Sequence, residues 1–274
     1  MKLTINHLTH YRYDEEVKFS TQYLRLTPQS SARQRIKAWN LTLPASAVAT
    51  TDTYGNIMHV LTLDAPHSDI TIHAQGVVEI ADSAEQADCR GESDALSPLV
   101  FLRATPLTQA DRPIREFARR HYRPQSPAES LMALMAELRV KMPYTPGATQ
   151  VQDSAAEAFA MQKGVCQDHT HVFLACCRSL QIPARYVSGY VYSADTQHVA
   201  MHAWAEAWLD DRWQSFDITN NTCRLNQHLL LAVGMDYLDA CPVRGTRLGG
   251  GCEEMFSEAE VRLFERQQQV QQQQ

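Results

Sequence analysis

Alternating apolar and polar positions dominate the first eighty residues and predict antiparallel β-structure. The runs are rich in β-branched and aromatic residues, and turn clusters such as Thr53-Tyr54-Gly55-Asn56 separate them. The predicted strands are residues 2–13, 22–27, 35–43, 57–63 and 70–80. This succession is typical of an antiparallel β-sandwich or barrel, and we assign residues 1–82 to an N-terminal β-rich domain.

From residue 108 onward the hydrophobic spacing becomes that of helices. The second predicted helix is preceded by Ser126-Pro127-Ala128-Glu129, which combines a serine cap, a proline at the first helical position and a glutamate three residues after the cap. Its apolar side chains lie on one stripe formed by Leu131, Leu134, Met135 and Leu138. The predicted helices are residues 108–122, 128–142, 154–161 and 166–180.

Residues 201–209 return to strict alternation and predict the first strand of a hairpin. Two aspartates at positions 210 and 211 mark the turn, after which the chain returns. A two-residue or a four-residue loop places Trp204 opposite Asp217, so that Asp217 becomes the diagonal neighbour of His202 on the same face. A three-residue loop would put the two side chains on opposite faces.

The remaining segments lack a clear period. Residues 83–105 include an acidic run and are predicted to be a linker to a core over residues 106–266. Residues 220–233 are expected to form a loop and a short helix. The glycine-rich residues 246–251 are expected to be a flexible turn, because they lack the setting of a phosphate-binding loop. Residues 253–266 fit a last strand and a frayed helix.

Composition narrows the class of protein. Of 274 residues, 44% are hydrophobic and 20% are charged, as in soluble globular chains. A net charge of −6 argues against nucleic acid or anionic membrane as the main partner. No apolar run approaches the roughly 20 residues that span a bilayer. The nearly pure glutamine stretch 267–274 is too polar to pack and predicts a disordered tail.

Cysteine usage points to a reducing compartment. The chain has seven cysteines, an odd number, and Cys176 and Cys177 are adjacent within a predicted helix. Neither fact suggests a disulfide framework. The first residues read as a strand and lack the long apolar region of a signal peptide. We therefore expect a cytoplasmic protein.

The candidate chemistry concentrates on Gly164-Val165-Cys166-Gln167-Asp168. Cys166 is placed at the start of the predicted apolar helix, where unpaired backbone N–H groups and the helix dipole stabilise a thiolate and can hold a developing oxyanion. His202 on the hairpin is the candidate base, and Asp217 is the candidate third member. We expect Asp168 to cap or orient the helix start.

Each of these residues also has a structural alternative. Cys166 could be a buried thiol, His202 a strand-face histidine and Asp217 a turn residue. Only their joint arrangement favours catalysis. The histidines of the N-terminal domain show no spacing of this kind and are expected to be surface or strand-face residues; they are His7, His10, His59, His67 and His73.

The order Gly-Val-Cys-Gln-Asp, His-Ala-Trp and Phe-Asp resembles the transglutaminase-like superfamily of cysteine enzymes. The bacterial branch described as transglutaminase-like cysteine proteases is most similar, also through residues 182–190 and 235–245. The resemblance implies an α+β protein with a papain-like core and a catalytic triad of Cys166, His202 and Asp217. Two departures are Met235, where arginine is expected, and Ile218-Thr219, where proline is expected after the aspartate.

The resemblance also implies a reaction. It is acyl transfer on peptide or isopeptide amides through a thioester, without a cofactor, and with a peptide or protein as partner. Water as acceptor gives a protease or amidase, which we expect; an amine gives a transglutaminase. Tyr144 lies on the loop that lines the cleft in this family and is a possible substrate contact, or else a buried structural tyrosine. Trp204 could line a drier acyl site or belong to the core.

Two readings without catalysis remain as alternatives. Cys166, His169 and His171 are close in sequence and could bind zinc. On a helix, however, the two histidines point about 200° apart, and no second paired-ligand motif appears. No acidic loop has the ligand spacing of a calcium site, so we expect no metal. The other alternative is a module that binds peptides without cleaving them.

Overall fold

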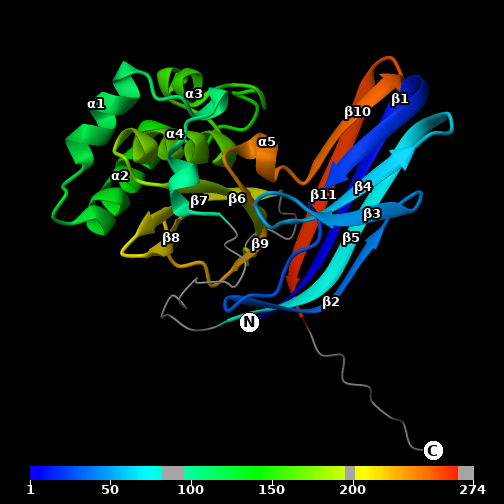
Figure 1. Ribbon diagram of the computed structural model, residues 1–274, viewed down its shortest axis with the longest axis horizontal. Coiled ribbons are helices and arrows are strands. Elements are labelled where there is room, and N and C mark those ends of the chain that lie inside the picture. Colours follow the sequence, from blue (N-terminus) through cyan, green and yellow to red (C-terminus); the bar gives the residue numbers. More distant parts are fainter. Residues whose placement is uncertain (82–95, 195–200, 265–274) are drawn as a thin grey trace, which may run out of the picture.

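The computed structural model describes residues 1–81, 96–194 and 201–264. Most of the predicted acidic linker and the predicted glutamine tail lie outside these residues. A curled antiparallel sheet forms one side of the molecule, and helices packed on a second, smaller sheet form the other (Figure 1). This is the expected combination of a β-rich domain with an α+β core.

The larger sheet is built around one long strand. β1 joins two of the predicted strands into one, although the alternation of buried and exposed side chains breaks at residues 14–19, where the pairing shifts register. Its first half pairs with β5 and its second half with β4. The order is β2-β5-β1-β4-β3, in which β1 is Lys2–Leu24, β2 is Gln34–Thr42, β3 is Ala47–Thr51, β4 is Ile57–Leu63 and β5 is His67–Ile80.

The C-terminal part of the chain completes this same sheet. β10 (Val243–Gly249) pairs with the second half of β1, and β11 (Glu253–Leu263) pairs with the first half. The expected flexible turn at 246–251 is therefore wrong, since a strand runs to Gly249 and only the glycines that follow turn the chain. Positive φ angles of 84°, 92° and 56° at positions 249–251 explain why glycines stand there.

These strands also change the expected domain division. Residues 243–263 belong to the sheet of the N-terminal domain, although the sequence placed them in the core. The frayed helix expected after residue 253 is wrong for the residues described, which continue as a strand. The pairing of β1 with β11 joins Leu3 to Leu263, a contact that no local pattern encodes.

The core packs helices on a four-stranded antiparallel sheet of order β8-β7-β6-β9. Asp111 caps α1 by accepting a hydrogen bond from the backbone N of Ile114 at 2.9 Å, so this helix begins later than predicted. The helices are α1 (Arg112–His121), α2 (Pro127–Lys141), α3 (Ala155–Met161), α4 (Cys166–Ser179) and α5 (Tyr237–Ala240). The strands are β6 (Ala184–Val191), β7 (His202–Leu209), β8 (Arg212–Phe216) and β9 (His228–Gly234). No helix of the described residues is both long enough and apolar enough to cross a membrane.

The predicted hairpin register is confirmed. Leu209 pairs with Arg212 and Ala205 with Phe216, as a two-residue loop requires. Both loop aspartates have positive φ, 51° and 56°, which matches the twist of the flanking strands. By contrast, the loop and short helix expected at 220–233 are wrong in their second half, because β9 begins at His228.

The last part of the predicted linker is structured. Residues 98–102 form a short 3₁₀ helix, and a second one follows at 106–108, directly after the predicted linker; Phe101 packs against Trp213 and Met235. Met235, where the family resemblance led us to expect arginine, thus has a buried side chain. Its carbonyl oxygen accepts a hydrogen bond of 2.6 Å from Arg178 at the end of α4.

Two amide side chains of the N-terminal domain cover the open edge of β9. The Gln34 amide donates to the carbonyl of Leu230 and accepts from its N–H, both at 2.9 Å. Asn56 does the same at Val233, at 2.8 Å each. A β-bulge between these positions explains their odd spacing. The amides act as a discontinuous extra strand, which leaves these backbone groups paired at an otherwise exposed sheet edge.

We expect Asn56→Ala to lower the free energy of unfolding by about 2–4 kcal/mol. The substitution leaves the N–H and C=O of Val233 without partners, and each buried backbone group without a partner costs about 1–3 kcal/mol. Asn40→Ala is the matched control, since Asn40 is exposed on β2 and bonds only to the Thr42 hydroxyl. Urea denaturation measures both variants. Equal midpoints for the two would contradict the role of the Asn56 amide at β9.

Candidate active site

Cys166 is the first residue of α4 and is half-buried. The turn before it is held by Asp168, whose carboxylate accepts hydrogen bonds from the Val165 N–H and the Thr149 hydroxyl, both at 2.7 Å. Gly164 is required there, because a Cβ would lie 2.6 Å from the Asp168 side chain. The expectation that Asp168 orients the helix start is confirmed.

His202 begins β7 and joins the helix start to Asp217. Its Nε2 lies 2.8 Å from Asp217 Oδ2. Burial lowers the pKa of His202, but hydrogen bonds to Asp217 and Cys166, together with their charges, outweigh it and raise the pKa to about 10. Because Nε2 is engaged with Asp217, Nδ1 is the ring nitrogen left for the Cys166 sulfur. At neutral pH the site therefore holds His202 as an imidazolium between the Asp217 carboxylate and the Cys166 side chain.

Asp217 is fully buried and fixed by its own turn. Its backbone pairs with Thr222, which closes the chain on itself directly after β8. Asn220 donates its backbone N–H to Asp217 Oδ1 at 3.1 Å and its side-chain amide to Oδ2 at 2.6 Å. Burial alone would raise the pKa of Asp217, but hydrogen bonds from His202 and His228, together with the charge of His202, hold it far below its usual range.

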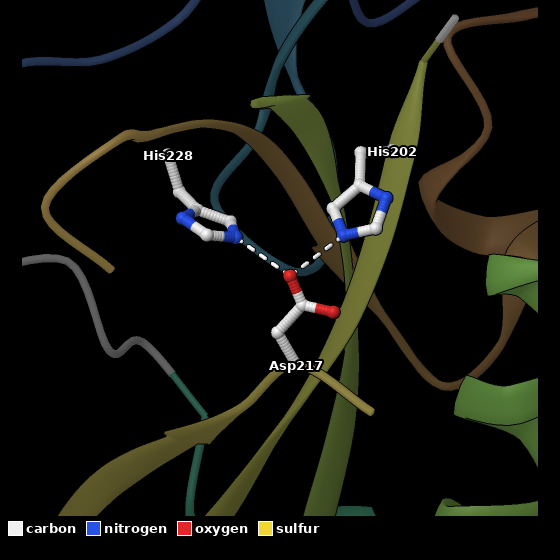
Figure 2. A group of neighbouring side chains, drawn as sticks. All are labelled: His202, Asp217 and His228. Carbon is white, nitrogen blue, oxygen red and sulfur yellow. Dashed lines mark hydrogen bonds and ion pairs between the residues drawn. The ribbon is translucent and has the colours of Figure 1, made fainter. Parts of the chain in front are cut away.

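The second of these histidines is His228, which the sequence analysis missed. It is the first residue of β9, and its Nε2 also lies 2.8 Å from Asp217 Oδ2. Both imidazoles converge on one carboxylate oxygen from different strands (Figure 2). The run His228-Leu229-Leu230-Leu231-Ala232-Val233-Gly234 is a short apolar stretch ended by a glycine, a pattern that fits a buried strand as well as a buried helical segment.

His169 links α4 to the turn after Asp217. Its Nε2 donates to the carbonyl of Met142 at 2.8 Å, which leaves Nδ1 to accept from the Thr219 hydroxyl at 2.9 Å. Thr219 stands in the segment where the family resemblance led us to expect proline, so here a side-chain hydrogen bond braces the turn. Burial lowers the pKa of His169, which keeps the ring neutral for this role.

The two residues predicted as possible substrate contacts differ in their exposure. Tyr144 is 54% exposed, so the alternative of a buried structural tyrosine is wrong. Its backbone bridges to Gly164, two residues before Cys166, and both burial and the Cys166 charge raise its pKa. Trp204 is only 1% exposed; its ring stacks on His202 and meets His228 edge-on. Trp204 therefore packs against both imidazoles and belongs to the core.

The described residues contain one group with the side chains of a metal site, formed by His202, Asp217 and His228. Their 2.8 Å separations are hydrogen-bond lengths. Two ligands of a tetrahedral zinc would lie about 3.3 Å apart. The Asn220 amide, a donor, also points at the shared oxygen. Hydrogen bonding therefore accounts for the group.

The zinc ligands considered from the sequence are not brought together. His169 faces Met142 and Thr219 with its two nitrogens, as described above. His171 instead accepts a hydrogen bond from the backbone N of Tyr237 at 3.1 Å. The predicted divergence of the two histidines along the helix is thus confirmed.

A helix that begins at a cysteine and packs on an antiparallel sheet bearing a buried histidine–aspartate pair defines a transglutaminase-type core. Family models agree: the transglutaminase-like superfamily matches residues 115–218, and the bacterial transglutaminase-like N-terminal region matches residues 3–79. The uncharacterized protein ML0607 of Mycobacterium leprae is 30% identical over 95% of this chain and 98% of its own. The chain therefore belongs to the transglutaminase-like superfamily.

Two further relatives support the extent of the match. Rv2569c of Mycobacterium tuberculosis, also uncharacterized, is 29% identical over 88% of this chain and 86% of its own. The crystal structure of a candidate cysteine protease from Cytophaga hutchinsonii superposes with a TM-score of 0.79 at 21% identity, covering 97% of this chain and 91% of that one. The similarity thus includes both the β-rich domain and the core.

We expect Cys166 to be the most reactive of the seven thiols. Cys176 and Cys177 are buried in α4, and burial raises the pKa of Cys223 and Cys241 to about 11. Limited iodoacetamide at neutral pH followed by peptide mapping tests this. Cys252 is exposed and serves as the internal standard for an ordinary thiol. Modification of Cys252 with Cys166 spared would contradict the expectation.

Proposed function

We propose that this protein is a cysteine-dependent amidase or protease that cleaves peptide or isopeptide amides through a thioester. One observation carries the proposal: His202 bonds to both Asp217 and Cys166, and its pKa is raised to about 10. That arrangement supplies a thiolate nucleophile and a proton donor together at neutral pH. The sequence motifs, the fold and the family membership agree with it.

The first half-reaction uses the imidazolium as an acid. The Cys166 thiolate attacks the carbonyl carbon, and a tetrahedral oxyanion forms. The N–H of Cys166 supports this oxyanion, because the first N–H groups of a helix have no intrahelical partner. His202 Nδ1 then donates its proton to the leaving amine as the C–N bond breaks, which leaves an acylated Cys166 and a neutral imidazole.

The second half-reaction reverses these roles. Neutral His202 takes a proton from an incoming water while the oxygen attacks the thioester carbonyl. The C–S bond then breaks, and the thiolate–imidazolium pair is restored as the acid leaves. Asp217 holds the imidazole in the tautomer that keeps Nδ1 toward the substrate and stabilises its positive charge. An amine in place of water would give a new amide, the transglutaminase reaction.

The substrate we propose is a peptide or protein amide that approaches over Tyr144. This side chain is an exposed aromatic group whose backbone bridges to Gly164, two residues before the start of α4. We also propose a reducing compartment, the cytoplasm, because the reaction needs a free thiol. No two of the six cysteines among the described residues form a disulfide.

A panel of peptide amides, incubated with and without a small primary amine, tests the proposed reaction. We expect mass spectrometry to show an acyl adduct on Cys166 and release of the free acid, with Cys166→Ala inactive. Excess chelator should leave the rate unchanged. A transamidated product that dominates over the acid would assign the amine as acceptor. Absence of any adduct, or loss of turnover on chelation with recovery on adding zinc, would contradict the proposal.

We expect Asp217→Asn to lower kcat by about 10–10³-fold, because the amide can present its N–H to the ring and favour the wrong tautomer; in a comparable serine triad the loss is about 10⁴. Loss of the carboxylate should also lower the pKa of His202, so the alkaline limb of the rate profile, near pH 10 in the native enzyme, moves to lower pH. Asp210→Asn, in the hairpin loop, is the matched control. Equal activity in both variants would contradict the orienting role.

A further inference from the structure

Asp217 receives a second imidazole that the proposed reaction does not use. His228 lies at the start of β9, 7% exposed, and its Nε2 reaches the same oxygen as His202 Nε2. The two imidazoles reach the same carboxylate oxygen from different directions (Figure 2). His228 is thus one of the donors that a fully buried carboxylate needs.

The hydrogen bonds fix the proton on His228. An ionised carboxylate only accepts hydrogen bonds, so a nitrogen bonded to Asp217 must carry hydrogen. Burial lowers the pKa of His228, which keeps its ring neutral with a single N–H. That hydrogen is on Nε2, and Nδ1 has no hydrogen-bond partner among the described residues. His228 is therefore a neutral donor, whereas His202 carries the charge.

Three donors from three segments converge on Asp217 Oδ2. His202 comes from β7, Asn220 from the turn after β8, and His228 from β9. The other oxygen receives the Asn220 N–H. Asn220 follows Asp217 by three residues and moves with it, so it cannot fix the carboxylate relative to the sheet. His228 is bound to a different strand and can.

We propose that His228 is a positioning residue, which holds the Asp217 carboxylate against His202 so that the imidazole keeps Nδ1 directed at Cys166. This rests on the proposed function and adds a fourth side chain to its machinery. Trp204 contributes by contacting both rings, with centroids 6.2 Å from His202 and 5.2 Å from His228. The two histidines therefore hold the Asp217 carboxylate between them through hydrogen bonds to its Oδ2.

Two variants separate positioning from packing. His228→Gln keeps an N–H donor at about the position of Nε2, whereas His228→Leu keeps bulk and removes the donor. His7→Leu is the control for loss of a buried histidine elsewhere, since His7 bonds to the Tyr190 hydroxyl at 2.7 Å and lies in β1. Each variant is purified as the full chain, and its thermal unfolding is recorded first.

The readout is the rate at which iodoacetamide alkylates Cys166, followed from pH 4 to pH 10, which needs no substrate. In His228→Leu we expect a 10–100-fold loss at pH 7, in the range found for groups that orient a reactive ligand, and a shift of the pH profile. We expect His228→Gln to remain within about threefold of the native protein. His7→Leu should keep the native profile even if its melting temperature falls.

On an amide substrate, the loss in His228→Leu should appear in kcat with KM little changed, because the residue does not touch the substrate. An unchanged alkylation profile in His228→Leu would overturn the positioning role. So would equal losses in the Leu and Gln variants, or stoichiometric zinc that is lost in His228→Gln. If the native protein itself shows no enhanced alkylation of Cys166, the proposed function fails instead, and the two failures are distinguishable.

Discussion

A fully buried, ionised carboxylate is the constraint on which this site depends. Removing such a charge from water costs several kcal/mol unless hydrogen bonds and opposite charge compensate for it. At Asp217 the compensation comes from His202, His228 and the turn that contains Asn220. Each donor belongs to a different segment, so the carboxylate is satisfied only when β7, β8 and β9 are assembled in their native order. Folding of the core and formation of the site are thus one event.

The β-rich domain takes part in that assembly. Its Gln34 and Asn56 amides pair with the backbone of β9, the strand that delivers His228. A buried group of ion pairs also joins the two domains. In it Glu206 on β7 accepts a hydrogen bond from Arg33 of the N-terminal domain at 3.0 Å and another from Arg185 on β6 at 2.8 Å. The larger domain therefore supports the sheet from which the site is built.

Local patterns predicted much of this arrangement. The helix start at Cys166 and the hairpin that sets Asp217 beside His202 both depend on residues close in sequence, for which capping and turn chemistry are sufficient. β9 was missed because its partner strand, β6, lies about forty residues earlier, and a short apolar run alone does not distinguish strand from helix. His228 was missed with it, since its role appears only when β9 takes its place. The return of β10 and β11 to β1 is a still longer-range contact.

That return has a consequence for how the protein is made. On one edge β1 meets β5 and β4, which emerge from the ribosome soon after it; on the other it meets β11 and β10, which are synthesised only after the whole core. Throughout translation the N-terminal sheet therefore presents an unpaired edge of up to 23 residues, the kind of surface that other chains can join. Charged residues along β1, among them Lys2, Arg12 and Lys18, lie on this edge strand during that interval. Nascent chains are thus most vulnerable to misassembly until β10 and β11 have been synthesised and have paired with β1.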